Sequence, residues 1–126
     1  MKSHILVVDD DARLRGLLSK YLRDNGFEIS TAENGAVAVE LVSLFKFDLM
    51  IVDVMMPEMD GYEATRLIRQ RPEWRKLPII AVTAKAMKDD QHRCLQAGAN
   101  DYLAKPIDLD RLFSLIRVWL PQLERI

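Results

Sequence analysis

Short runs of apolar and β-branched residues alternate along the chain with segments in which apolar residues recur every three or four positions. Runs of the first kind, bounded by polar residues, are typical of buried β-strands. Five of them are predicted to form strands: Ile5–Val8, Glu28–Ala32, Asp48–Asp53, Pro78–Thr83 and Asp101–Ala104. The chain is therefore predicted to alternate strand and helix along its length.

Two of the intervening segments show helical spacing most clearly. The first places apolar side chains at Leu14, Leu17, Leu18, Tyr21 and Leu22, and the second at Leu109, Leu112, Phe113, Ile116 and Leu120. Residues three and four positions apart lie on one side of a helix, so each set predicts one apolar helix face. We expect the first helix to end near Asn25-Gly26 and the last one to be closed by Pro121.

Five strand–helix pairs predict an α/β fold, (βα)5, in which helices cover both faces of a parallel sheet. Burial of both faces explains why the runs Leu6–Val8 and Leu49–Val52 do not alternate with polar residues. A chain of 126 residues can bury one continuous core and is short for two ordinary domains. We expect a single domain over residues 1–126.

Four of the five predicted strands end in residues that could form a chemical site together. Ligands of an open parallel sheet bind outside the carboxyl ends of its strands. These ends carry Asp9 with Asp10, Asp53, Thr83 and Lys105. Two carboxylates about 4 Å apart repel by roughly 4 kcal/mol at an effective dielectric of 20, so three clustered acids need a cation or raised pKa values. Mg²⁺, a hard ion that prefers oxygen, is the predicted cofactor.

This set of side chains predicts phosphoryl chemistry. With the metal bound, Asp53 can attack a phosphoryl group as a covalent nucleophile. The Lys105 ammonium can pair with Asp53 and then with a phosphoryl oxygen, and the Thr83 hydroxyl can donate to another. As simpler alternatives, Asp9 and Asp10 could only cap the first helix, and Asp53 could be an ordinary strand-end acid. Asp11 is expected to have a capping or solvated role.

Charge and cysteine content narrow the function classes. Eighteen basic and nineteen acidic side chains leave a formal charge of −1, which gives no global attraction for nucleic acid or an anionic membrane. The single cysteine, Cys94, cannot form an intrachain disulfide and is expected to pack on the fourth helix. His4 and His92 lie too far apart in the predicted fold for a metal pair. With no secretory start or membrane-length apolar run, we expect a cytoplasmic protein.

Four motifs resemble response-regulator receiver domains, the phosphoacceptors of two-component signalling: "VVDDD", "DVMMPEMDG", "AVTA" and "DYLAKPI". The resemblance covers nearly the whole chain and implies a flavodoxin-like three-layer sandwich with strand order 2-1-3-4-5. It implies phosphorylation at Asp53, with Mg²⁺ bound by Asp10, Asp53 and the backbone carbonyl of Met55, and with Asp9 acting through water. It also implies that Thr83 and Lys105 contact the phosphoryl group.

The same resemblance implies further properties. The Lys105-Pro106 bond is usually cis in receivers. The phosphoryl donor is a histidine kinase or a histidine phosphotransfer protein, and the domain catalyses its own phosphorylation and dephosphorylation. The stretches "AVTAKAMKDD" and "MDGYEATRLIR" resemble receivers of hybrid histidine kinases, although single-domain regulators share them. Side chains two positions after Asp53 and Thr83, here Met55 and Lys85, influence the water that attacks the phosphoryl group. Met55 has no good hydrogen-bonding group to orient that water, so we predict slow loss of the phosphoryl group.

We expect the switch to couple Thr83 to Tyr102. Thr83 would move toward the phosphoryl oxygen and Tyr102 would turn into the vacated space, although a static aromatic is the alternative. A downstream protein is then expected to bind the face formed by the fourth helix, fifth strand and fifth helix. That face is predicted to carry Lys88, Arg93 and Arg111, and no direct contact of this domain with nucleic acid or membrane is expected.

Other functions fit the sequence less well. A nucleotide-binding enzyme would have a glycine-rich first turn, whereas this turn is acidic. A haloacid dehalogenase-type phosphatase would have an acid two positions after the nucleophile, where this chain has Met55. The remaining alternative is a receiver-like module that binds proteins without being phosphorylated.

Overall fold

The computed structural model describes residues 2–84 and 87–120, and within them the sheet has five parallel strands in the order β2-β1-β3-β4-β5. The strands are β1 His4–Val8, β2 Glu28–Ala32, β3 Leu49–Asp53, β4 Ile79–Thr83 and β5 Asp101–Ala104. The predicted fold class and strand order are confirmed. Three predicted strand starts, at Ile5, Asp48 and Pro78, differ from the structure by one residue, within the usual uncertainty of element ends.

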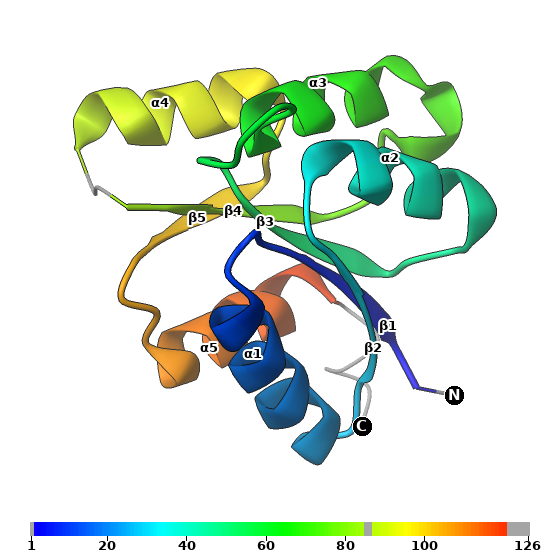
Figure 1. Cartoon of the computed structure of the whole chain (residues 1–126), viewed down its shortest axis with the longest axis vertical. Helices are drawn as coiled ribbons and strands as arrows, with labels where there is room; N and C mark the ends of the chain where they lie inside the picture. Colours follow the sequence, from blue (N-terminus) through cyan, green and yellow to red (C-terminus); the bar gives the residue numbers. More distant parts are fainter. Residues whose placement is uncertain (1, 85–86, 121–126) are drawn as a thin grey trace.

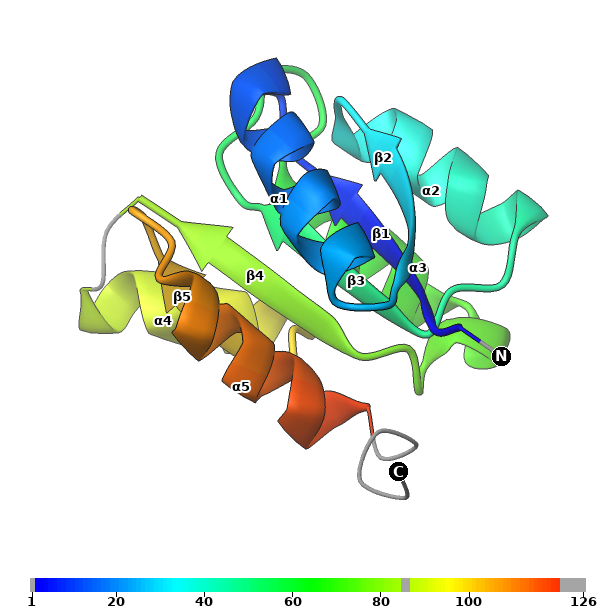
Figure 2. The ribbon, with the colours of Figure 1, turned by 90° about the horizontal axis from the view of Figure 1, so that it is seen from below.

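Helices cover both faces of this sheet (Figure 1). Their bounds are α1 Ala12–Asp24, α2 Gly35–Leu44, α3 Gly61–Gln70, α4 Lys88–Ala97 and α5 Leu109–Trp119, with a short 3-10 helix, η1, at Pro72–Trp74. The helices α2, α3 and α4 lie on one face, and α1 and α5 lie on the other, where Figure 2 shows them in front of the strands. The molecule is thus a three-layer sandwich, as predicted. No described helix is long and apolar enough to cross a lipid bilayer.

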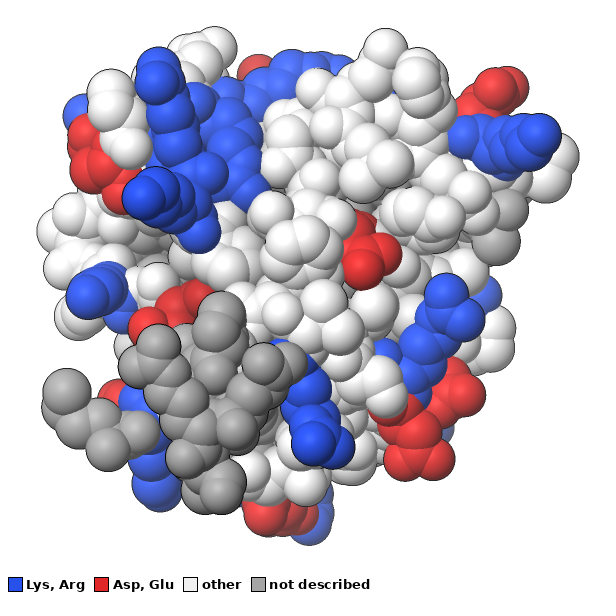
Figure 3. Space-filling view, turned by 180° about the vertical axis from the view of Figure 1, so that it is seen from behind, with Lys and Arg blue, Asp and Glu red and all other residues white. Residues whose placement is uncertain are grey.

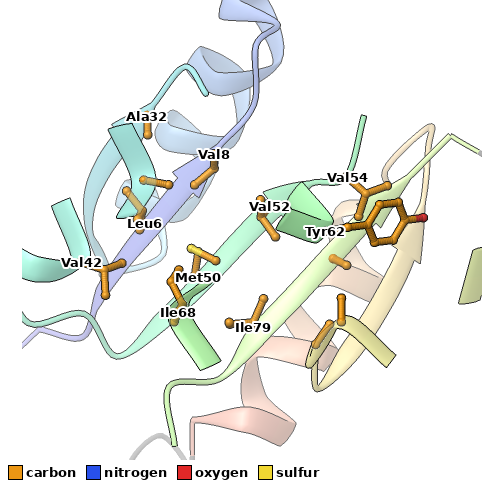
Figure 4. Packing of buried hydrophobic residues seen from close by; sticks show 14 of the residues in the cluster. Leu6, Val8, Ala32, Val42, Met50, Val52, Val54, Tyr62, Ile68 and Ile79 are labelled. Atoms are coloured by element: carbon orange, nitrogen blue, oxygen red, sulfur yellow. The ribbon is translucent and has the colours of Figure 1, made fainter. Parts of the chain in front are cut away.

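The strands bury both of their faces in separate hydrophobic clusters. Along β1, Leu6 and Val8 belong to the cluster beneath α2, α3 and α4, and Ile5 and Val7 belong to the cluster beneath α1 and α5. Figure 4 shows part of the first cluster, in which residues of β1, β3 and β4 meet helix residues such as Val42. Because successive side chains point to opposite faces, a strand buried on both sides has no polar alternation.

The ends of the helices follow from local sequence. Asp11 is the N-cap of α1, and its carboxylate accepts hydrogen bonds from the backbone N–H groups of Arg13 and Leu14. The expected capping role of Asp11 is confirmed. Asn25 is the C-cap of α1 and Gly26 follows with a φ of 94°, as expected for a helix stop at this point. Pro121 lies outside the described residues.

The predicted apolar face of α1 is wrong at one position. Leu17 is 54% exposed, whereas Leu18 and Leu22 are buried and Leu14 packs partly against the same cluster. A helix this close to a sheet buries the stripe formed by positions 14, 18 and 22, and position 17 points away from that stripe. On α4, Cys94 is buried, as predicted.

Candidate functional site

The carboxyl ends of four strands bring the predicted site residues to one edge of the sheet. Figure 2 shows the arrowheads of β1, β3 and β4 pointing the same way. Asp53 is the last residue of β3 and Thr83 the last of β4, and both are buried. Asp9 and Asp10 directly follow β1, and Lys105 directly follows β5. The structure therefore assembles residues that lie far apart in the chain.

The three acids form a compact group. Their carboxylate oxygens, one each from Asp9, Asp10 and Asp53, all lie within 4.8 Å of one another. Asp9 and Asp53 are 3% exposed, whereas Asp10 is exposed and its carboxylate has no hydrogen-bond partner among the described residues. Oxygen donors so arranged, two anchored and one facing solvent, fit a hard divalent cation that keeps several waters.

Lys105 brings a positive charge to the buried carboxylates of this site. Its Nζ lies 3.1 Å from Oδ2 of Asp53 and 3.3 Å from Oδ2 of Asp9. Partial burial works against the charged ammonium, but hydrogen bonding and attraction to Asp53, together with the attraction of Asp9, outweigh it, so the pKa of Lys105 is raised. Lys105 is therefore held as a cation between the two buried carboxylates.

For Asp9, burial and neighbouring groups together disfavour the charged form of the side chain. Burial raises the pKa of its carboxyl above the ordinary value, and repulsion from Asp53 acts in the same direction. The hydrogen bond from the Asp11 N–H and the attraction of Lys105 lower the pKa but do not cancel the rise. The ionised form of Asp9 is thus disfavoured in the protein, which is the electrostatic strain that a bound cation would relieve.

Backbone groups fix the orientation of both buried carboxylates. The N–H of Met55 donates to Oδ1 of Asp53 at 3.0 Å, and the N–H of Asp11 donates to Oδ1 of Asp9 at 2.9 Å. In each acid the other oxygen, Oδ2, contacts Lys105. Each carboxylate is therefore held between a backbone N–H group and the Lys105 ammonium. The Lys105-Pro106 bond is cis, as the resemblance implies.

The loop after β3 is pressed against the start of α3. The N–H of Gly61 donates to the carbonyl of Val54 at 3.1 Å. A Cβ atom at position 61 would overlap the carbonyl oxygen of Asp53 and lie 2.7 Å from the Cα of Val54. Only glycine allows this close approach, which sets the path of the chain directly behind Asp53.

One positioning residue had no signal in the sequence. Arg15 lies on the first turns of α1 and its Nη1 donates to the backbone carbonyl of Asp9 at 2.7 Å. This contact ties the end of β1 to the helix that follows it. No motif or helical spacing relates positions 9 and 15, so sequence reasoning could not have found the pair.

The predicted output face is only partly as expected. Tyr102 is half-buried and borders a hollow of about 280 Å³ that Arg111 also lines, and Lys88 lines a second hollow beside it. Arg93 is a correction, because its guanidinium lies 4.4 Å from the centre of the Tyr62 ring of α3. Arg93 therefore faces the neighbouring helix α3 and not β5. Lys85 lies outside the described residues.

Comparisons with known proteins give a consistent picture. The family model described as "Response regulator receiver domain" matches residues 5–117. The signal transduction histidine-protein kinase BarA of Shigella flexneri is 40% identical over 117 residues, which are 93% of this chain and 13% of BarA. The chain spans 13% to 56% of the length of the first curated relatives that it matches.

Solved structures agree. The receiver domain of the sensor histidine kinase PA1611 from Pseudomonas aeruginosa, solved with a magnesium ion in its active-site cleft, has a TM-score of 0.89 and 36% identity, covering 96% of this chain and 99% of that one. The receiver domain of Ssk1 from Saccharomyces cerevisiae, solved with the histidine phosphotransfer protein Ypd1, has a TM-score of 0.89 and 29% identity, covering 94% and 89%.

Proposed function

Because the chain belongs to the family of response-regulator receiver domains, we propose that Asp53 accepts a phosphoryl group from a phosphohistidine and that this switches a protein-binding surface. The observation that carries the proposal is the position of Asp53, buried at a strand end between Lys105 and two further acids. A carboxylate in this setting is oriented, paired with a cation and close to donors suited to a divalent metal. These are the requirements of an aspartyl nucleophile.

Each site residue has its own role in the phosphoryl transfer. A carboxylate oxygen of Asp53 forms a bond to phosphorus while the bond from phosphorus to the imidazole nitrogen of the donor breaks, and the imidazole leaves. Lys105, already beside Asp53 Oδ2, pairs with a phosphoryl oxygen, and the Thr83 hydroxyl donates to another. Asp10, Asp53 and the Met55 carbonyl would hold Mg²⁺, with Asp9 acting through water. When bound, the ion neutralises charge on the phosphoryl oxygens.

The donor is a histidine kinase or a histidine phosphotransfer protein. Two observations on relatives support this: BarA is named a histidine-protein kinase, and the Ssk1 receiver was solved with a phosphotransfer protein. Output passes through the face made by α4, β5 and α5. A phosphoryl group shifts a two-state balance only if it interacts differently with the two states, and a new hydrogen bond from Thr83 provides that difference. Tyr102 follows by turning into the space that Thr83 leaves.

Phosphorylation from acetyl phosphate tests the proposal. The intact protein with Mg²⁺ should gain the mass of one phosphoryl group, and Asp53→Asn or addition of EDTA should abolish the gain. Asp10→Asn should chiefly weaken Mg²⁺ binding, because it removes a ligand charge and leaves the acceptor. Full labelling of Asp53→Asn would refute the acceptor assignment. A protein that binds Mg²⁺ but is never labelled would instead be the phosphorylation-independent binding module.

A further inference from the structure

A groove of about 660 Å³ lies at the edge of the sheet opposite Asp53. Its lining includes residues just before β3 and β4, such as Phe47 and Pro78, and also Trp119, the last residue of α5, and Leu120, which follows it. The volume falls within the usual range for pockets that bind ligands, about 300–1,000 Å³. The phosphorylation chemistry uses none of these residues, so the groove needs its own explanation.

The groove has an exposed apolar lip. Leu44 and Phe45, at the end of α2, are 65% and 55% exposed and both line the groove. Trp74 of η1 and Trp119 of α5 add aromatic surface to its walls. Exposed leucine and aromatic side chains beside a concavity are typical of surfaces that bind proteins.

Among the described residues around the groove, the acidic side chains have hydrogen-bond or ion-pair partners and the lysines have no ion-pair partner. Among its described lining residues, both acids have partners: Asp48 accepts from the N–H of His4 at 2.8 Å, and Glu73 lies 3.6 Å from Nη1 of Arg71. Its two lysines, Lys46 and Lys76, are exposed and have no ion-pair partner within residues 2–84 and 87–120. The charge left to attract a ligand is therefore positive.

A basic patch continues from the groove onto α3. Residues 66–76 contain five basic side chains and one acidic one in a chain whose formal charge is −1. Figure 3 shows Lys and Arg gathered at the upper left of the back face, where α3 and η1 lie in this view. One of the five, Arg69, is occupied internally, donating to the carbonyls of Gly98 and Trp74. The others, Arg66, Arg71, Arg75 and Lys76, are exposed.

We propose that this groove and the adjoining patch bind an acidic protein segment that inserts one or two large apolar side chains between Trp74, Phe45 and Trp119. The concave apolar centre accounts for the anchor residues, and the unpaired lysines account for acidic residues beside them. The surface lies at the opposite end of the strands from Asp53, so it binds whether or not Asp53 is phosphorylated.

A labelled peptide provides the probe. Fluorescence anisotropy would follow a fluorescein-labelled ten-residue peptide rich in Asp and Glu, with one Trp and one Leu three positions apart. Its matched peptides replace the acids by Gln or the two apolar residues by Ser. We expect the first peptide to bind with a Kd below about 1 mM, and each matched peptide to bind about tenfold more weakly. Equal binding of all three peptides, or none by the first, would overturn the proposal.

Variants locate the binding surface. Lys46→Glu with Lys76→Glu, and separately Leu44→Ser with Phe45→Ser, should each weaken binding about tenfold. The matched control, Arg13→Glu with Lys20→Glu on α1, makes the same charge change at exposed positions and should leave the affinity unchanged. Equal losses in the control and the groove variants would show attraction by net charge alone and would refute the site.

Further measurements distinguish an acidic protein segment from other ligands that the groove could bind. Raising NaCl from about 50 to 500 mM should weaken binding to the unaltered protein, a test that needs no variant to fold. Stronger binding of phosphatidylserine vesicles or of a DNA oligonucleotide than of the peptide would overturn the choice of partner. A dimer in sedimentation that the Leu44 and Phe45 changes abolish would give the groove to a second copy instead. Asp53→Asn should bind the peptide normally, so the two proposals fail independently.

Discussion

The ammonium of Lys105 lies 3.1 Å from a carboxylate oxygen of Asp53, although 52 positions separate the two residues in the chain. Lys105→Gln removes this cation and should slow labelling by acetyl phosphate roughly 100-fold, the usual scale for loss of one oxyanion donor. Mg²⁺ affinity, measured by calorimetry, should rise, because the ammonium no longer competes for the carboxylates. Lys20→Gln, at an exposed lysine on α1, is the control. An unchanged labelling rate would contradict the role of Lys105.

Asp9 gives a prediction about pH. Its pKa is raised in the folded protein, first by burial and then by Asp53, so ionised Asp9 weakens the fold. That penalty is absent below the pKa of the unfolded chain and grows as pH rises through the folded pKa. Asp9→Asn should therefore raise Tm at pH 7.5 without Mg²⁺, and the gain should shrink as pH is lowered toward 4.

Two further measurements serve as controls for the predicted effect of Asp9→Asn on Tm. Asp24→Asn, at an exposed acid of α1, should change Tm little at any pH. Saturating Mg²⁺ should stabilise the unaltered protein more than Asp9→Asn, because the substitution removes negative charge near the ion. A gain in Tm that stayed constant from pH 4 to 7.5 would mean that the ionisation of Asp9 is not its cause.

Met55 should govern how long the phosphoryl group lasts. Its side chain is 64% exposed and has no strong hydrogen-bonding group to orient an attacking water, while its N–H holds Asp53. Met55→Asn should speed loss of phosphate roughly tenfold by supplying a polar group for that water. Met87→Asn, at another methionine with 64% exposure, should leave the rate unchanged. A slower or equal rate in Met55→Asn would count against this account.

The switch can be followed by NMR with beryllofluoride, a mimic of the phosphoryl group. Ring resonances of Tyr102 should shift when the mimic binds, and Thr83→Ala should suppress the shift because the new hydrogen bond is lost. Tyr21, on α1 at the other face of the sheet, serves as the internal reference. If Tyr102 stays unmoved while the mimic is demonstrably bound at Asp53, Tyr102 is a static aromatic residue.

Of the two basic residues on α3, Arg69 should be the one whose replacement destabilises the fold more. Its guanidinium donates to Gly98 O, Trp74 O and Asn100 Oδ1, each at 2.8 Å, and joins α3 to two other segments. Arg69→Ala removes all three of these hydrogen bonds, although Asn100 Oδ1 still accepts from the N–H of Ile79, and should lower the free energy of unfolding by about 3 kcal/mol in urea. Arg66→Ala, exposed on the same helix, should change it by no more than about 0.5 kcal/mol.

The strands and the gathering of the strand-end residues were predicted correctly because they follow from the pattern of apolar and polar residues along the chain. A run such as Leu49–Val52, apolar at every position, belongs to a strand buried on both faces, and the strands β2 and β5 were predicted with their bounds in the structure. Because parallel strands end at one edge, the residues at their ends also predicted the assembled site. Asp53 and Lys105 could therefore be placed together without any knowledge of the contacts between them.

The remaining features depend on tertiary geometry. Which side of α1 meets the sheet decides that Leu18 is buried and Leu17 is exposed, and both positions fit an apolar stripe in the sequence. The contact of Arg15 with the Asp9 carbonyl joins two unrelated positions. The stacking of Arg93 on Tyr62 depends on how closely α4 approaches α3. None of these has a periodic signal, so spacing arguments could not supply them.

Gly61 limits which sequences can carry this site. The loop behind Asp53 has no room for a single methyl group at position 61, because its carbon would overlap the Asp53 carbonyl oxygen. Any other amino acid at this position has to displace the strand end that presents the nucleophile. A residue that contributes no atom to the reaction therefore decides whether the nucleophile can be presented, and in mutational scanning of position 61 we expect every replacement to reduce phosphorylation of Asp53.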